Sequence, residues 1–124
     1  MTQQISTAKP GEGLWLWLSK FITGFLIIFL IGVHLTVNHF VAEGGLQTYQ
    51  DVINYFSNPW IVTMEIVFLI VVVSHSLVGL RSIILDLNPA RRLMSVIDWA
   101  LGILGVASIA YGVWLALVIA SLST

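Results

Sequence analysis

Three stretches of this sequence are so long and so apolar that they exclude most soluble folds. They cover residues 14–40, 60–85 and 96–122, and a helix of about 20 residues suffices to cross ~30 Å of hydrocarbon. Of the whole chain, 58% is hydrophobic and 9% is charged. A soluble protein of 124 residues has too little interior to bury that much apolar surface. We therefore predict an all-α membrane protein with one domain of three transmembrane helices over residues 14–124.

The segments outside these runs are short and polar. Residues 1–13 form a polar tail without the features of a cleavable signal peptide. After the first run, apolar residues recur at helical spacing at Leu46, Tyr49, Ile53 and Phe56. This spacing predicts a short amphipathic helix on the membrane surface.

Two features of the third run predict where it begins and how it packs. Ser95 and Asp98 fit a capping box, which would start the helix near Val96. Small residues recur at spacings of three and four at Gly105, Ser108, Gly112 and Ala116. Small residues in that register let helices approach closely in lipid, so we expect this side to dock against another helix.

The basic residues predict the orientation. Lys9 and Lys20 lie near the N-terminus, and Arg91 and Arg92 lie in the second connection, beside Arg81. The first connection has no basic residue. By the positive-inside rule, the N-terminus and the second connection are cytoplasmic and the C-terminus is outside.

An ionisable residue, His75, interrupts the second apolar run. Polar side chains are costly in lipid and usually face protein or a cofactor. Gly79, one turn further on, removes the side chain that would block a flat group, and Arg81 and Asp86 follow at the polar edge. An axial nitrogen, clearance and a cation near the propionates are what a haem requires. A structural histidine bonded to a neighbouring helix explains His75 equally well.

The other histidines lie at different depths. At 1.5 Å per residue, His34 lies ~28 Å from the cytoplasmic side and His75 roughly 8 Å from it, so one iron cannot bind both. Two irons would each need a second ligand from a partner chain. By chemistry alone, His34 is slightly better explained as an interfacial polar residue, and His39 as a solvated one. Glu65, inside the second run, is neutral, paired with a partner, or part of a proton path.

Several classes of function are excluded for this chain. The absence of cysteine excludes disulfides, iron–sulfur ligation and thiol catalysis. A net charge of −1 argues against a nucleic-acid partner. No phosphate-binding loop or catalytic constellation is present, so the chain alone has no catalytic site.

The spacing His-x-x-x-Gly-x-Arg-x-x-x-x-Asp, formed by His75, Gly79, Arg81 and Asp86, resembles the signature of the hydrophobic anchor subunits of succinate dehydrogenase and fumarate reductase. This resemblance implies a heteromeric helical bundle with a second anchor subunit in the inner (cytoplasmic) cell membrane. The two anchors hold an iron–sulfur subunit and a flavoprotein subunit. Electrons from succinate pass through FAD and iron–sulfur clusters to quinone, so the chain is a non-catalytic subunit of an enzyme.

The resemblance also implies roles for individual residues. His75 matches the ligand of a b haem, with Gly79 and Arg81 beside it, and His34 matches the ligand of a second haem in members that bind two. We therefore expect two b haems, each shared with the partner anchor. Phe21 stands where the family often has arginine, which favours a D-type rather than a C-type anchor. Leu87 stands where many D-type anchors have a quinone-binding tyrosine, so quinone is expected mainly against the partners.

Two other functions are compatible with the sequence. One is a small transporter or proton-path subunit in which Glu65 and the histidines line the path. The other is a structural membrane anchor without haem. A transport path should gather its polar residues near mid-membrane, whereas His34 and His75 are expected at the two borders.

Overall fold

The computed structural model describes residues 13–41 and 48–123. Within these ranges all regular structure is helical, and it consists of α1 (Leu14–Thr36), the π-helical turn η1 (Val37–Val41), α2 (Tyr49–Phe56), α3 (Pro59–Asp86) and α4 (Arg91–Ser121). Three helical segments are long and apolar enough to cross a membrane, at Leu14–Phe40, Pro59–Asp86 and Arg91–Ser121. The predicted all-α fold with three spans is confirmed. The predicted tail, apart from Gly13, and Leu46 lie outside the described residues.

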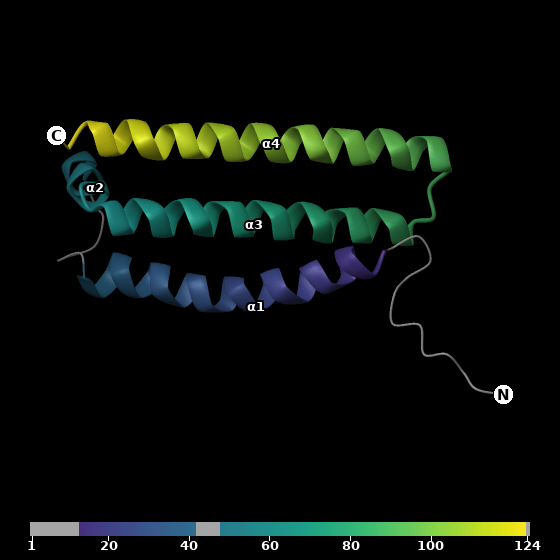
Figure 1. Ribbon diagram of the computed structural model, residues 1–124, viewed down its shortest axis with the longest axis horizontal. Coiled ribbons are helices and arrows are strands. Elements are labelled where there is room, and N and C mark those ends of the chain that lie inside the picture. The colour runs from purple at the N-terminus through teal and green to yellow at the C-terminus, as the bar shows by residue number, and fades with distance from the viewer. Residues whose placement is uncertain (1–12, 42–47, 124) are drawn as a thin grey trace.

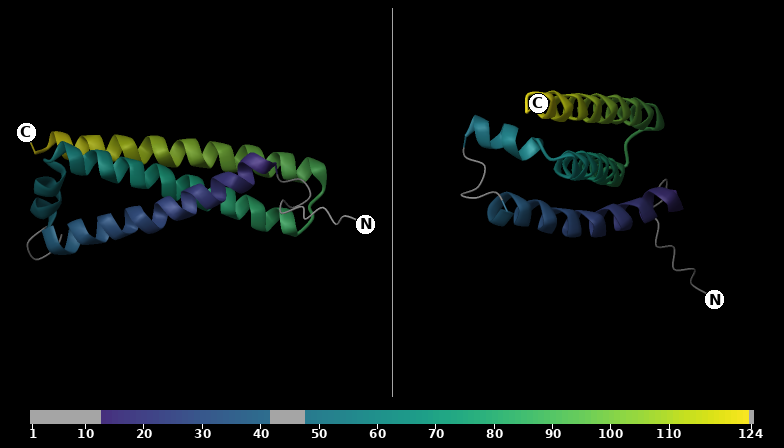
Figure 2. Two further views of the ribbon diagram at one scale, coloured as in Figure 1. Left: turned by 60° about the horizontal axis from the view of Figure 1, so that its bottom comes forward. Right: turned by 60° about the vertical axis from the view of Figure 1, so that its left-hand side comes forward.

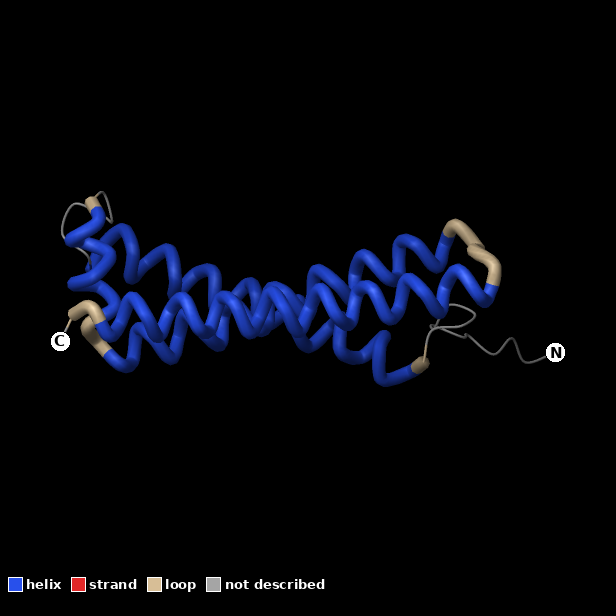
Figure 3. The backbone as a smooth tube through the Cα atoms, turned by 90° about the horizontal axis from the view of Figure 1, so that it is seen from above, coloured by secondary structure: helices blue, strands red, loops and turns tan. Residues whose placement is uncertain are grey.

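The three long helices form an open row rather than a closed bundle. α3 lies between α1 and α4, as Figure 1 shows, and α1 crosses α3 obliquely in the left view of Figure 2. Seen from above, the long helices cross near their middles and diverge toward their ends (Figure 3). Among the described residues, α3 contacts both neighbours, whereas α1 and α4 do not approach each other. Each outer helix therefore has a face that no part of the described chain covers.

The short helix α2 lies across the end of the row where α1 ends and α3 begins (Figure 1). Its start is fixed by a capping box, in which Asp51 N–H donates to Thr48 Oγ1 at 3.2 Å and Thr48 N–H donates to Asp51 Oδ2 at 2.8 Å. Ile53 and Tyr55 are buried against the row, and Tyr49 is exposed. The predicted amphipathic helix is thus present from Tyr49 to Phe56, packed on α3 and α4.

Local chemistry explains the bounds of α3. Asn58 caps its start by accepting a hydrogen bond from Trp60 N–H at 3.0 Å, and Pro59 occupies the first turn, where its missing N–H costs nothing. At the other end, Asn88 adopts a left-handed φ of 51° directly after the C-cap. Asparagine tolerates this conformation better than most residues, and Pro89 cannot continue the helix.

The predicted start of the third span was wrong. α4 begins at Arg91, five residues before Val96, and its N-cap is Ala90, which makes no side-chain cap. The turn at Asn88 and Pro89 is so short that a new helix starts at once. Asp98 lies two turns inside α4, where its carboxylate accepts hydrogen bonds from Arg81 instead of capping a helix. Ser95 and Asp98 thus match a capping box in residue type, but they do not cap a helix.

The small residues of the third span pack as predicted, and their partner is α3 of the same chain. A Cβ on Gly105 would lie 2.7 Å from Leu77 Cδ1, and one on Gly112 would collide with the Leu69 side chain. Gly105 and Ala116 are buried. The stripe therefore lets α4 lie close against α3, and the opposite face of α4 carries exposed apolar residues such as Val96 and Ile103.

Candidate functional site

His75 faces α1 across the first helix interface. Its Nδ1 lies 2.9 Å from Thr23 Oγ1. The single hydroxyl hydrogen of Thr23 is used elsewhere, because Thr23 Oγ1 donates to the Ser19 carbonyl at 2.6 Å. The threonine oxygen must then accept, so His75 Nδ1–H is the donor. This arrangement fixes one tautomer and leaves the lone pair on Nε2.

Two glycines shape the space around His75. Gly24 of α1 lies against the ring, and a Cβ there would be 3.3 Å from His75 Cε1. Gly79 lies one turn along α3 and borders open space, since a Cβ there would meet no atom of the described chain within 4 Å. The ring is therefore held from one side by α1, while the helix surface beyond it has no bulky side chain.

The cation that shares a face with His75 is Lys20, which sequence reasoning did not assign to the site. Lys20 Nζ donates to the buried Ser82 Oγ at 3.0 Å. Ser82 lies seven residues after His75, which places both on nearly the same side of α3 at 100° per residue. Lys20 and Thr23 are three residues apart on α1, so they also lie on one side of their helix. This helical spacing of two polar residues in the first span is the sequence pattern that could have assigned Lys20 to the site.

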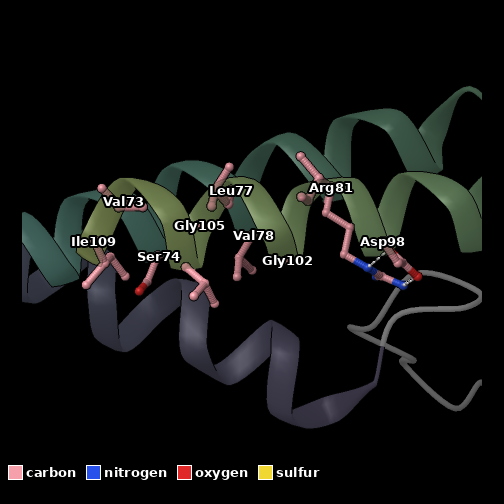
Figure 4. A pocket seen from close by; sticks show the side chains of 11 residues that line it. Val73, Ser74, Leu77, Val78, Arg81, Asp98, Gly102, Gly105 and Ile109 are labelled. Carbon is pink, nitrogen blue, oxygen red and sulfur yellow. Dashed lines mark hydrogen bonds and ion pairs between the residues drawn. The ribbon is translucent and has the colours of Figure 1, made fainter. Parts of the chain in front are cut away.

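Arg81 points elsewhere. At six residues from His75 it lies about 120° around α3, on the side that faces α4. Its guanidinium donates to both oxygens of Asp98, from Nε at 2.7 Å and from Nη2 at 3.2 Å. This bidentate pair closes one end of a groove of ≈ 380 Å³ between α3 and α4 (Figure 4). The structure thus brings Arg81 to Asp98 and not to the α1 side of His75. The sequence-based pairing with a propionate stays a prediction.

His34 lies at the other end of the α1–α3 interface, in a different environment. Its Nδ1 is 2.9 Å from Glu65 Oε1 and 3.1 Å from Glu65 Oε2. Tyr55 of α2 donates its hydroxyl hydrogen to Glu65 Oε1 at 2.5 Å. The Phe68 ring packs beside the imidazole, with 4.9 Å between ring centroids. Glu65 is therefore partnered within this chain, by His34 of α1 and by Tyr55 of α2.

Asn38 completes the surroundings of His34. Its amide nitrogen donates to the His34 carbonyl at 2.8 Å and lies 3.2 Å from each ring nitrogen. A point equidistant from both nitrogens lies off the axis of either lone pair. Asn38 Oδ1 is buried without a hydrogen-bond partner in the described part of the chain. Asn38 thus braces the ring, with its amide beside both ring nitrogens rather than on the axis of either.

The setting of Tyr55 changes its acidity. Burial raises the pKa of the Tyr55 phenol above its ordinary value of 10.0, and the hydrogen bond to Glu65 and the charge of that carboxylate act in the same direction. Tyr55 therefore remains a neutral donor to Glu65 over the physiological pH range.

The third histidine, His39, lies in η1 and is exposed, as expected for a solvated residue.

The two histidines occupy two levels along the α1–α3 interface. Thr23 and His34 are eleven residues apart on α1, and Glu65 and His75 are ten apart on α3. At 1.5 Å per residue both spacings give a separation of about 15 Å along the helices. The described residues contain no group of three or more histidine and acidic side chains that could hold a metal ion by themselves. An iron bound at either histidine would therefore need further ligands from outside the described residues.

These features define a multi-pass membrane protein that presents two separated histidines, each braced through Nδ1. Comparison with known proteins gives the family. Residues 1–123 match the model of the succinate dehydrogenase/fumarate reductase transmembrane subunit, and the chain belongs to that family. The resemblance inferred from the sequence motif is confirmed at this level.

Relatives of known name support the same assignment. The succinate dehydrogenase hydrophobic membrane anchor subunit of Thermoplasma acidophilum is 31% identical over 102 residues, which cover 82% of this chain and 83% of the relative. The protein of the same name from Archaeoglobus fulgidus is 29% identical over 80% of this chain and 84% of its own length. Succinate dehydrogenase 2 membrane subunit SdhC of Mycobacterium tuberculosis is 29% identical over 76% and 69%. No solved structure matches the chain.

Proposed function

We propose that this chain is a haem-b-binding anchor subunit of a succinate:quinone oxidoreductase in the cytoplasmic membrane. With a second hydrophobic anchor it holds the iron–sulfur and flavoprotein subunits at the membrane and helps electrons reach quinone. Family membership and the anchor names of the relatives support the coarse role of a non-catalytic membrane subunit. The D-type assignment is part of the proposal.

The observation that carries the haem proposal is the bonding of His75. Thr23 engages Nδ1, which leaves Nε2 as the nitrogen with a lone pair, and no hydrogen bond to Nε2 forms among the described residues. Iron ligands of this kind almost always donate the other ring N–H to a nearby acceptor. Gly79 leaves the helix surface beside the ring clear. The residues present therefore fit a flat ligand approached from outside the α1–α3 interface.

A bound b haem would supply one-electron transfer. The protein's own contribution would be to hold each imidazole in one orientation and one tautomer, through Thr23 at His75 and through Glu65 at His34. The separation of about 15 Å between the two levels supports two haems rather than one. Lys20, which is bonded to Ser82, and Arg81 place two cations about two helical turns from the level of His75.

A reduced-minus-oxidised spectrum of the purified complex tests the proposal. The unaltered complex should show a b-type α band with two components. His75→Ala should remove one component and His34→Ala the other, because each removes one axial ligand. His39→Ala is the matched control, since His39 is exposed, and it should leave both components in place. An unchanged spectrum in His75→Ala would refute the assignment of that ligand.

The proton-path alternative rests on the hydrogen-bonded set of His34, Tyr55 and Glu65. A path across the membrane would have to continue from Glu65 to His75. Residues 25–33 of α1 and 66–73 of α3 lie between the two levels and carry neither a hydroxyl nor an ionisable side chain. The α1–α3 interface therefore offers no relay between the two levels, which favours the haem proposal over a path along that interface. A complex without any b-type band would favour the alternatives, transport or a structural anchor.

A further inference from the structure

The carboxylate of Glu65 joins three elements at one point. It meets His34 from α1 and Tyr55 from α2 while standing on α3 itself. The side chain of Glu65 is 15% exposed and that of His34 is 30% exposed, so water reaches this contact only in part. Hydrogen bonds to an ionised acceptor are stronger than neutral ones, and more so when partly shielded from water.

The geometry indicates which atom carries the hydrogen. Both carboxylate oxygens lie within 3.1 Å of the one nitrogen, His34 Nδ1. This is the arrangement of a single N–H shared between two acceptor oxygens, and Tyr55 also donates to Oε1, so Glu65 is the acceptor in both contacts. His34 is then protonated on Nδ1 and has its lone pair on Nε2, the same tautomer that Thr23 selects at His75.

We propose that Glu65 is a positioning residue for His34, which fixes the tautomer of the ring and makes Nε2 a stronger donor to ferric haem iron. The inference rests on the proposed function, because it concerns the haem assigned to His34. A charged acceptor on Nδ1–H pushes electron density into the ring, and outer partners of this kind raise the basicity of the ligand. The stronger donor favours the ferric over the ferrous state, so the reduction potential of this haem is lowered.

Tyr55 acts on the same carboxylate in the opposite sense. Its hydroxyl donates to Glu65 Oε1, the oxygen nearer to His34 Nδ1. A donor on that oxygen withdraws electron density from the contact with His34. Removing the hydroxyl should therefore strengthen the pull of Glu65 on Nδ1–H, whereas removing the charge of Glu65 should weaken it. The two variants should shift the potential in opposite directions.

The test compares Glu65→Gln and Tyr55→Phe in the full complex, with spectroscopic titration of both b components. Glu65→Gln should raise the potential of the component that His34→Ala removes, and weaken haem retention there by about 10- to 100-fold. If ferric affinity falls tenfold more than ferrous affinity, the rise is about 59 mV for one electron. Tyr55→Phe should lower the potential of the same component. The His75 component is the internal control and should not move in either variant.

The hydrogen bond between His34 and Glu65 can also be tested without haem. Nitrogen NMR of His34 in the haem-free complex should show hydrogen on Nδ1, and Glu65→Gln should weaken that preference because an amide offers both a donor and an acceptor.

The outcomes separate the two claims. If Glu65→Gln leaves the potential and the tautomer of His34 unchanged and lowers only thermal stability, Glu65 is structural and the inference fails while the haem proposal stands. A shift of the same sign in both variants would also overturn it. If His34→Ala removes no haem component, the haem assignment at His34 fails, and the inference falls with it.

Discussion

The two histidines of this protein are held by the same interface and yet by different chemistry. At His75 the partner of Nδ1 is a neutral hydroxyl, Thr23, which is itself tied to the backbone of α1. At His34 the partner is a carboxylate, Glu65, which also receives the hydroxyl of Tyr55 from a third element. The first site is built by two helices alone, and the second depends on the docking of α2. The two histidines, which we propose as haem ligands, thus differ in the acceptor at Nδ1 and in mechanical support.

The largest expected effect comes from filling the space against His75. In Gly24→Val, the new side chain would start 3.3 Å from His75 Cε1 and branch toward it, so the ring has to leave its position. We expect loss of the His75 haem component with retention of the His34 component. Gly32→Val is the matched control on the same helix, because a Cβ at Gly32 meets nothing within 4 Å. Equal spectra for the two variants would show that the α1 contact does not position His75.

Removing the acceptor at His75 should have a smaller effect. Thr23→Val keeps the shape of the side chain but loses the oxygen that accepts from Nδ1–H. We expect haem retention at His75 to weaken by about 10-fold, at the lower end for an outer-shell partner, because the lost acceptor is neutral. Thr36→Val is the control, since Thr36 is exposed and makes the same bond to its own helix, donating to the Gly32 carbonyl at 2.8 Å. Quantitative haem extraction from the purified complexes measures the difference.

The Arg81–Asp98 pair gives the next smaller effect and tests a prediction that the structure leaves open. Both Arg81→Gln and Asp98→Asn remove the same ion pair, whose side chains are 20% and 39% exposed, so each should cost about 1 kcal/mol or less of stability. If Arg81 also contacts a haem propionate, Arg81→Gln should in addition weaken haem retention, whereas Asp98→Asn should not. Equal haem content in the two variants would remove Arg81 from the haem site.

The residues that α1 contributes to the two sites could be found from their helical spacing in the sequence. Lys20, Thr23, His34 and Asn38 fall within about 60° of one helical face at 100° per residue. A polar stripe on an apolar helix has to face protein, so this side of α1 could have been assigned to an interface. The three spans and the close packing of the small-residue stripe on α4 were predicted on similar grounds.

The pairings across elements could not be predicted in the same way. That His34 meets Glu65, and His75 meets Thr23, depends on the vertical register of α1 against α3, which no local pattern encodes. The reach of Tyr55 to Glu65 depends on the angle at which α2 returns to the row. The capping pattern at Ser95 and Asp98 failed for the same reason, because the tertiary contact with Arg81 determines what Asp98 does.

The smallest expected effect is a loss of stability at alkaline pH that comes from Tyr55, beside His34. The pKa of Tyr55 is raised in the folded protein, so its neutral form stabilises the fold. That contribution is fully present below pH 10.0, the ordinary pKa, and is lost as pH rises above it toward the folded value. Unfolding temperatures should therefore fall more steeply above pH 10 in the unaltered protein than in Tyr55→Phe. Tyr49→Phe, at an exposed position of α2, should behave like the unaltered protein.

The haem spectrum at alkaline pH gives a second measurement of the same difference. Because Thr23 does not ionise, the His75 component should keep its spectrum while the His34 component changes. A simultaneous change at both would mean that the two sites are not independent.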